Sequence, residues 1–121
     1  MTWLKKSCCI FAYSSAGEAG RNFNFETVEE FSAVDYTYSW SDRTQRLVKC
    51  KNCGALFLYE KFVFKAMRYE DDDSYYTAFY PVKNRKEALK YSKLDGLALK
   101  SGYNGKFIEL ADGGHWQWNE N

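Results

Sequence analysis

Apolar and polar side chains alternate over several stretches of this chain, and the alternation predicts a sheet. Across residues 55–67, Leu56 and Leu58 fall on one side while Phe57 and Tyr59 fall on the other, which is the two-residue period of a strand. Residues 46–50 precede this segment, so we predict a strand pair that turns at residues 51–54. A helix over 55–67 is the alternative, which the density of aromatic side chains disfavours.

Further strands are predicted on both sides of this pair. The apolar run 8–14 predicts a short central strand, followed by a loop of small residues at 14–22, and the alternating run 34–40 predicts another strand. Residues 75–82 predict a strand that ends at Pro81. Residues 105–110 and 115–119 flank an Asp-Gly turn, which is typical of a tight hairpin.

Two capping-box spacings predict helices. Thr27 lies three residues before Glu30 and predicts a short helix over about 28–33. Asn84 and Glu87 have the same spacing and predict the main helix over about 85–95, with Gly96 at its C-terminal end. The predicted fold is a single α+β domain over residues 1–121, a mostly antiparallel twisted sheet with these two helices.

Composition and charge narrow the kind of partner. The chain has 121 residues, with 4 Trp, 10 Tyr, 9 Phe and only 1 Pro, and its net charge is +1. This balance disfavours a general nucleic-acid binder, which usually carries a basic excess. No stretch approaches the roughly 20 apolar residues that span a bilayer, and no secretory signal is apparent. We therefore expect a cytoplasmic protein with reduced thiols and with neither a membrane nor a direct nucleic-acid partner.

Cys50 and Cys53 form the one motif with recognised chemistry. Two thiolates spaced by two residues, with Gly54 freeing the turn, can hold a tetrahedral metal ion, and residues 50–56 resemble one knuckle of a zinc ribbon. Such sites take two knuckles, and the remaining candidate ligands are Cys8, Cys9 and His115. Neighbouring side chains on a strand point to opposite faces, so Cys8 and Cys9 make a poor second knuckle. One of them could still join Cys50 and Cys53, with His115 or a second chain completing the site. We expect no cofactor, with zinc at Cys50 and Cys53 as the alternative.

Two other interpretations of the motif stay open. A thioredoxin-type site places its cysteines where a strand feeds a helix N-terminus, whereas the residues after Cys53 predict a strand. The motif is otherwise a tight corner between two strands, with two free thiols. His115 is the one histidine and has no nucleophile beside it in a recognisable motif, so the sequence predicts no enzyme.

Acidic and tyrosine side chains gather ahead of the strand predicted at 75–82. The group consists of Tyr69, Glu70, Asp71, Asp72, Asp73, Tyr75 and Tyr76. Clustered carboxylates favour a basic cleft on a protein partner, and tyrosine offers a large contact area at low entropic cost. A solvated loop tip is the alternative. Calcium is disfavoured because the DxDxDG spacing is absent.

The stretch from CKNCGALFLYE to DDDSYYTAFYPVKNRKEAL resembles small bacterial proteins encoded near polymorphic toxins. With its short length, aromatic content and acidic run, the chain is similar to the immunity proteins of polymorphic and contact-dependent toxin systems. The resemblance implies a non-enzymatic antitoxin that binds a toxin domain, commonly a nuclease, and blocks its active site. A zinc-ribbon-like binding module that uses Cys50 and Cys53 is the alternative function.

Overall fold

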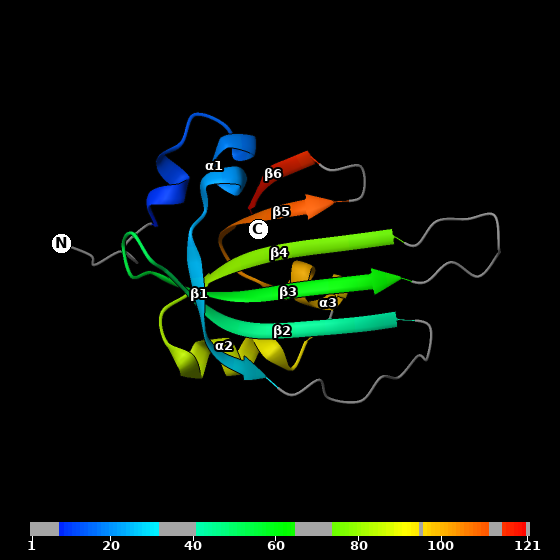
Figure 1. The fold of residues 1–121 in the computed structure, drawn as a ribbon. Helices are drawn as coiled ribbons and strands as arrows, with labels where there is room; N and C mark the ends of the chain where they lie inside the picture. The colour runs from blue at the N-terminus through cyan, green and yellow to red at the C-terminus, as the bar shows by residue number, and fades with distance from the viewer. Residues whose placement is uncertain (1–7, 32–40, 65–73, 95, 112–114, 121) are drawn as a thin grey trace.

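Six strands lie in one antiparallel sheet, each beside its neighbour in sequence (Figure 1). The computed structural model describes residues 8–31, 41–64, 74–94, 96–111 and 115–120. The strands are β1 (Phe25–Phe31), β2 (Ser41–Cys50), β3 (Leu56–Phe64), β4 (Ser74–Val82), β5 (Lys106–Ala111) and β6 (His115–Glu120). The helices are the 3-10 helix η1 (Cys9–Ala12) and the α-helices α1 (Ala16–Asn22), α2 (Arg85–Ser92) and α3 (Gly96–Gly102). The predicted α+β class is confirmed.

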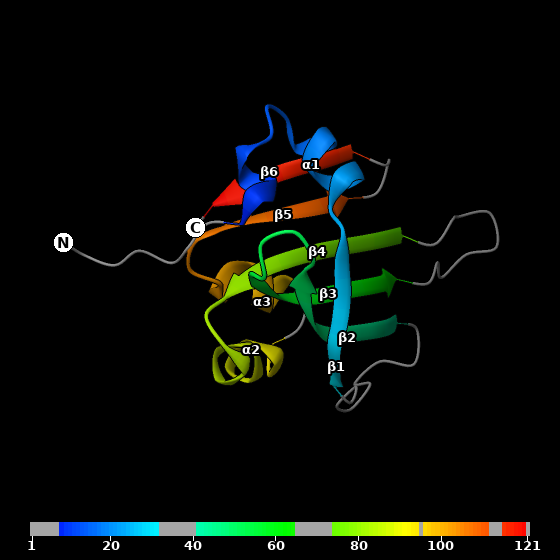
Figure 2. The ribbon, with the colours of Figure 1, turned by 60° about the vertical axis from the view of Figure 1, so that its left-hand side comes forward.

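The sheet has an apolar core on each face, because neighbouring side chains of a strand point in opposite directions. Val48, Phe57 and Phe79 enter the first core together with residues of η1 and α1. Leu47, Leu58 and Tyr80 enter the second core, which α2 and α3 cover. Figures 1 and 2 show the two layers, with η1 and α1 beside β6 and with α2 and α3 together on the opposite face.

The first core is dense in aromatic rings around Phe79. The ring centroids of Phe23, Phe25 and Tyr59 lie 4.8, 5.0 and 5.1 Å from that of Phe79. Gly20 lets α1 pack directly on β6, since a Cβ atom at this position would lie 2.2 Å from the ring of Trp116. The N-terminal helices are thus held on the sheet by close packing over β6.

Three predicted elements agree with the structure. The strand pair that turns at 51–54 is present as β2 and β3, and the C-terminal hairpin is present as β5 and β6. Helix α2 begins as predicted, because the Asn84 side chain accepts a hydrogen bond from the backbone N–H of Glu87 at 2.9 Å. The helix is shorter than expected, and Gly96 begins α3 instead of ending α2. Strand β4 continues through Pro81 to Val82.

The predicted helix over 28–33 is wrong, because residues up to 31 belong to β1. Glu26 and Glu30 lie directly opposite Lys49 and Arg46 of β2, with nitrogen–oxygen distances of 3.5 and 3.2 Å. Pairing of opposite charges across strands stabilises a sheet and here overrides the local capping pattern. Val28 falls where the register shifts, and its side chain is 53% exposed.

The predictions for residues 8–22 are also wrong, while the strand predicted at 34–40 lies outside the described residues. The N–H of Phe11 donates to the carbonyl of Cys8 at 3.0 Å, which closes a turn of η1 where a strand was expected. The Ser15 hydroxyl accepts from the N–H of Glu18 at 3.2 Å and begins α1 where a loop was expected. Ser15 and Glu18 have the capping-box spacing, which is typical of a helix N-terminus.

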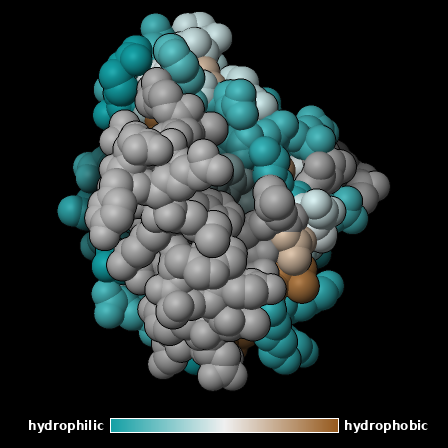
Figure 3. All heavy atoms as spheres, turned by 90° about the vertical axis from the view of Figure 1, so that its right-hand side faces the viewer, coloured by the Kyte–Doolittle hydropathy of each residue, from teal (hydrophilic) through white to brown (hydrophobic). Residues whose placement is uncertain are grey.

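Seen from the end of the sheet where β3 ends and β4 begins, the described side chains are mostly hydrophilic, with one small hydrophobic patch (Figure 3). The opposite end of β2 and β3 is the turn that carries Cys50 and Cys53. The Cys50 and Cys53 motif therefore lies at one end of the sheet, where the N-terminal segment also arrives.

Candidate metal centre

The turn between β2 and β3 places Cys50 and Cys53 on one tight bend. The N–H of Gly54 donates to the carbonyl of Cys50 at 2.8 Å, and the N–H of Cys50 donates to the carbonyl of Ala55 at 2.9 Å. Gly54 has a φ of 80°, a left-handed conformation that glycine adopts without a steric penalty. The two-residue spacing of the cysteines and the conformation of Gly54 thus form the tight turn that the sequence predicted for one knuckle of a metal site.

The N-terminal segment presents its two cysteines differently from a strand. Cys8 is extended, with φ −65° and ψ 148°, and Cys9 is the first residue of η1. Side chains alternate between opposite faces only along a strand, so this change of backbone conformation lets adjacent cysteines serve one site. The objection that Cys8 and Cys9 face opposite directions therefore does not hold.

Four thiols converge where these two segments meet. The sulfur atoms all lie within 4.8 Å of one another and belong to Cys8, Cys9, Cys50 and Cys53, hereafter the thiol centre. The sulfur of Cys53 lies 3.4 Å from that of Cys8, and the sulfur of Cys9 lies 3.8 Å from that of Cys50. A tetrahedral zinc ion with Zn–S bonds of about 2.3 Å separates its sulfurs by about 3.8 Å. The spacing of the thiols is thus close to that of a tetrathiolate site.

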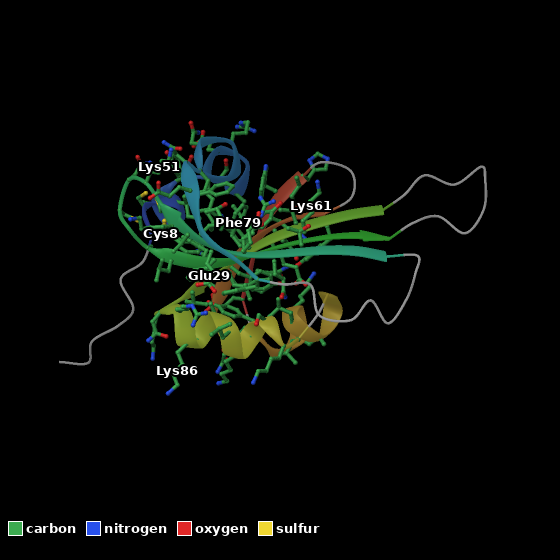
Figure 4. The ribbon with its side chains drawn as sticks, turned by 60° about the horizontal axis from the view of Figure 1, so that its bottom comes forward. Cys8, Glu29, Lys51, Lys61, Phe79 and Lys86 are labelled. Atoms are coloured by element: carbon green, nitrogen blue, oxygen red, sulfur yellow. The ribbon has the colours of Figure 1, made fainter. Side chains whose placement is uncertain are left out.

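The thiol centre lies at the margin of the first core. Cys50 and Cys8 are 0% and 4% exposed, whereas Cys9 and Cys53 are half-buried. Figure 4 shows Cys8 at the same corner of the molecule as Lys51, which lies in the turn between Cys50 and Cys53. Two sulfurs are therefore screened by apolar side chains, and two are within reach of solvent.

Backbone amides favour the charged form of one sulfur. Burial raises the pKa of Cys53, but hydrogen bonds from the amides of Cys9 and Ala55, together with those from the thiols of Cys8 and Cys50, outweigh burial and lower the pKa to about 7. Burial raises the pKa of Cys8 far above its usual range and also raises the pKa of Cys9. Without a cation the centre favours few thiolates, whereas a bound metal ion deprotonates its thiol ligands.

The chemistry of this donor set is specific. Thiolate ligands select zinc or iron–sulfur chemistry over magnesium or calcium, and four protein ligands leave no open position for a substrate. A thioredoxin-type mechanism has no support here, because β3 follows Cys53 in place of a helix. The arrangement therefore suits a closed, structural metal centre.

The predicted metal ligands are only partly those that the structure brings together. Cys50 and Cys53 are joined by Cys8 and Cys9, whereas His115 begins β6, is exposed and does not belong to the cluster. The sequence named Cys8 and Cys9 as candidates, but the predicted strand allowed only one of them to join Cys50 and Cys53. The missed signal was the capping-box spacing at Ser15 and Glu18, which argues for helices in this segment.

The predicted partner surface is mostly outside the structure's described ranges. Tyr69, Glu70, Asp71, Asp72 and Asp73 precede β4, and the side chain of Tyr75 is not described. Tyr76 is half-buried in β4, and its hydroxyl donates to Glu109 at 2.5 Å and lies 3.3 Å from the hydroxyl of Tyr80. The hydroxyl of Tyr76 is therefore engaged within the fold.

Glu109 of β5 is the centre of a second polar group, which the sequence analysis did not identify. Its carboxylate is 0% exposed and accepts hydrogen bonds from Tyr76, Lys100, Gln117 and Asn119. We call these four residues and Glu109 the carboxylate network. Burial raises the pKa of Glu109. The hydrogen bonds from Tyr76, Gln117 and Lys100, together with the positive charge of Lys100, outweigh burial and lower the pKa. The network thus holds a buried carboxylate in its charged form.

Comparison of the chain with protein-family models, with curated proteins and with solved structures gives no match. None of the described helices is long and apolar enough to cross a membrane. The function of the thiol centre is therefore argued from its own chemistry.

Proposed function

We propose that this chain is a zinc-binding protein in which the thiol centre holds one structural Zn²⁺ ion. The observation that carries the proposal is the convergence of four sulfur atoms within 4.8 Å from two segments more than 40 residues apart in the sequence. Chance burial of cysteines places single thiols in a core, whereas a tetrathiolate zinc site needs this grouping. The function that follows is that of a non-enzymatic binding module with a metal-supported corner.

The position of the centre explains what the ion would contribute. It would join the N-terminal segment to the β2–β3 turn, two pieces that in the described structure meet through the amide of Cys9 and the sulfurs. Since the binding free energy of structural zinc is also folding free energy, the ion would fix η1 on the sheet. Helix α1 would then be held at one end by the metal and at the other by the packing of Gly20 on Trp116.

Elemental analysis of protein purified without chelator tests the proposal. We expect one zinc ion per chain, and less than a tenth of that in Cys50→Ser, because three thiolates and a hydroxyl bind zinc more weakly. A second variant, Cys53→Ser, changes a half-buried position and guards against misfolding of the first. Cobalt substitution should give the intense visible absorption of a tetrahedral tetrathiolate complex.

The matched control is Lys51→Ser, an exposed change in the same turn that keeps all four thiols. It should keep the full zinc content. Wild-type protein that is folded but free of zinc and cobalt, or a folded Cys53→Ser that keeps full stoichiometry, contradicts the proposal.

For the biological partner, we propose the antitoxin function that the family resemblance implies. Its support is the acidic and tyrosine-rich sequence at 69–76, together with the position of that run between the paired strands β3 and β4. Reversing Asp71, Asp72 and Asp73 to Lys should weaken binding to the proposed cognate toxin domain by at least tenfold. The salt dependence of binding should also fall, because fewer opposite charges meet at the interface.

The measurement is titration at two ionic strengths. The control reverses Glu18, Glu29 and Glu120, three acidic side chains in other elements, so the net charge changes equally. Equal losses in both variants, or none in the first, would exclude the run at 69–76 as the binding surface.

A further inference from the structure

The thiol centre consists of two sulfur pairs, each of which joins the N-terminal segment to the β2–β3 turn. Cys8 and Cys53 are separated by 3.4 Å, and Cys9 and Cys50 by 3.8 Å, across sequence separations of 45 and 41 residues. A disulfide bond needs sulfurs at about 2 Å, so the first pair requires the smaller movement. Both of these sulfur contacts thus run between the segments.

Each pair combines one accessible and one buried sulfur. Cys53 and Cys9 are half-buried, whereas their partners Cys8 and Cys50 are 4% and 0% exposed. An oxidant arriving from solvent therefore meets one member of a pair first, with the second sulfur directly behind it. This is the arrangement of an attacking and a resolving cysteine, which together turn oxidation into a disulfide.

We propose that Cys53 and Cys8 are an oxidation site for hydroperoxides, where a disulfide replaces the metal ion as the link between the two segments. The sulfur of Cys53 attacks the peroxide, so that the O–O bond breaks, water or an alcohol leaves, and Cys53 becomes a sulfenic acid. The sulfur of Cys8 then attacks that of Cys53, the S–S bond forms and the S–O bond breaks. The hydroxide that leaves becomes water by taking the thiol proton of Cys8 in metal-free protein, or a proton from solvent in zinc-loaded protein, where Cys8 is already a thiolate. The two sulfurs lose the two electrons that reduce the peroxide.

Metal release is the consequence for the zinc ion. A tetrathiolate ion that loses Cys8 and Cys53 keeps only two ligands, which is too few for a stable structural site. Because the new bond joins the same two segments as the ion did, η1 stays attached to the turn after the ion has left. Oxidation thus exchanges one link for another, and release of zinc rests on the proposed function whereas formation of the disulfide does not.

Hydrogen peroxide is the probe, applied to zinc-loaded and to metal-free protein in parallel. Zinc release is followed with a chromogenic chelator, and disulfides are mapped by mass spectrometry of proteolytic peptides under non-reducing conditions. We expect the Cys8–Cys53 linkage to be the most abundant first product in both arms, with one zinc ion released per disulfide formed. Dithiothreitol and added zinc should restore the starting protein.

Variants separate the two roles. In Cys8→Ser the sulfenic acid at Cys53 has lost its proposed resolving partner, so trapping by dimedone at Cys53 should rise at least fivefold over wild type. In Cys53→Ser, dimedone trapping at Cys8 should stay low, because Cys8 is buried. Lys51→Ser is the control and should react as the wild type does.

A dominant disulfide within one segment, Cys50–Cys53 or Cys8–Cys9, overturns the proposal in either arm. If removal of the metal unfolds the chain, the zinc-loaded arm decides the pairing, since its thiols start from the folded geometry. If the protein binds no zinc, the proposed function fails, and the metal-free arm alone decides whether the Cys8–Cys53 pair is the oxidation site.

Discussion

Two groups of polar side chains lie on opposite faces of the same sheet, each around a fully buried member, and their charged forms would be stabilised in different ways. The carboxylate network of Glu109 lies under α3 on the face of the second core, and the described hydrogen bonds to its carboxylate come from side chains of β4, α3 and β6. The thiol centre lies on the face of the first core, where its sulfurs have mainly one another as partners. The first group has a cation and three further donors among its own members, and the second would be completed by the proposed zinc ion.

The difference follows from the donors that each face supplies. Around Glu109, the described hydrogen-bond partners include an ammonium group, two amides and a phenol, and these stabilise a buried charge. Backbone amides donate hydrogen bonds to the sulfurs of Cys53 and Cys8. Among the described residues, no lysine or arginine contributes to the pKa shifts of these two thiols. Thiolates in such surroundings need a positive charge from outside the chain, which a metal ion supplies.

The largest effect that separates the two groups should come from metal removal. Chelation of zinc-loaded protein should lower the free energy of unfolding by about 4 kcal/mol or more, which is the stabilisation that a ligand gives at a thousandfold its Kd. Urea unfolding with and without a strong chelator measures this. Hydrogen exchange should localise the loss to η1, α1 and the β2–β3 turn, while β5 and β6 keep their protection.

The control is Cys53→Ser, which should unfold at the same urea concentration with and without chelator. If chelator leaves wild-type stability unchanged although zinc is removed, the ion is not a structural link, and the two groups do not differ as argued.

The sequence predicted the knuckle but not its partner segment, and the two capping boxes show why. Thr27 with Glu30 and Asn84 with Glu87 have the same spacing, yet the first lies in a strand and the second begins a helix. In the first case Glu30 and the nearby Glu26 pair with Arg46 and Lys49 of β2. These contacts join two segments, so no local sequence pattern predicts them.

The same limit applies to the thiol centre. The turn at Cys50 and Cys53 is closed by hydrogen bonds of Cys50 with Gly54 and Ala55, no more than five positions away, so spacing and glycine were enough to predict it. The approach of Cys8 and Cys9 depends on packing more than 40 residues away in sequence. The carboxylate network was missed for a related reason, since Glu109 has an ordinary alternating position and its donors come from β4 and α3 as well as from its hairpin partner β6.

A smaller effect, confined to the other face, should come from Glu109→Gln. The amide that replaces one carboxylate oxygen is itself a donor and would face the donors of Tyr76, Gln117 or Asn119, and the charge opposite Lys100 would be lost. We expect the free energy of unfolding to fall by about 3 kcal/mol, near the lower bound for breaking a buried ion pair because Lys100 is partly exposed. Urea unfolding at neutral pH measures the change.

Glu120→Gln is the matched control on the same hairpin, where the side chain is exposed and stability should be unchanged. Adding Lys100→Met to Glu109→Gln should recover part of the loss, because the ammonium group then no longer lies against a neutral amide. Zinc content should stay at one ion per chain in all three variants, since the network lies across the sheet from the thiols. A loss of zinc in Glu109→Gln would show that the two faces are coupled, and a stability equal to that of Glu120→Gln would show that the network contributes nothing to the folded state.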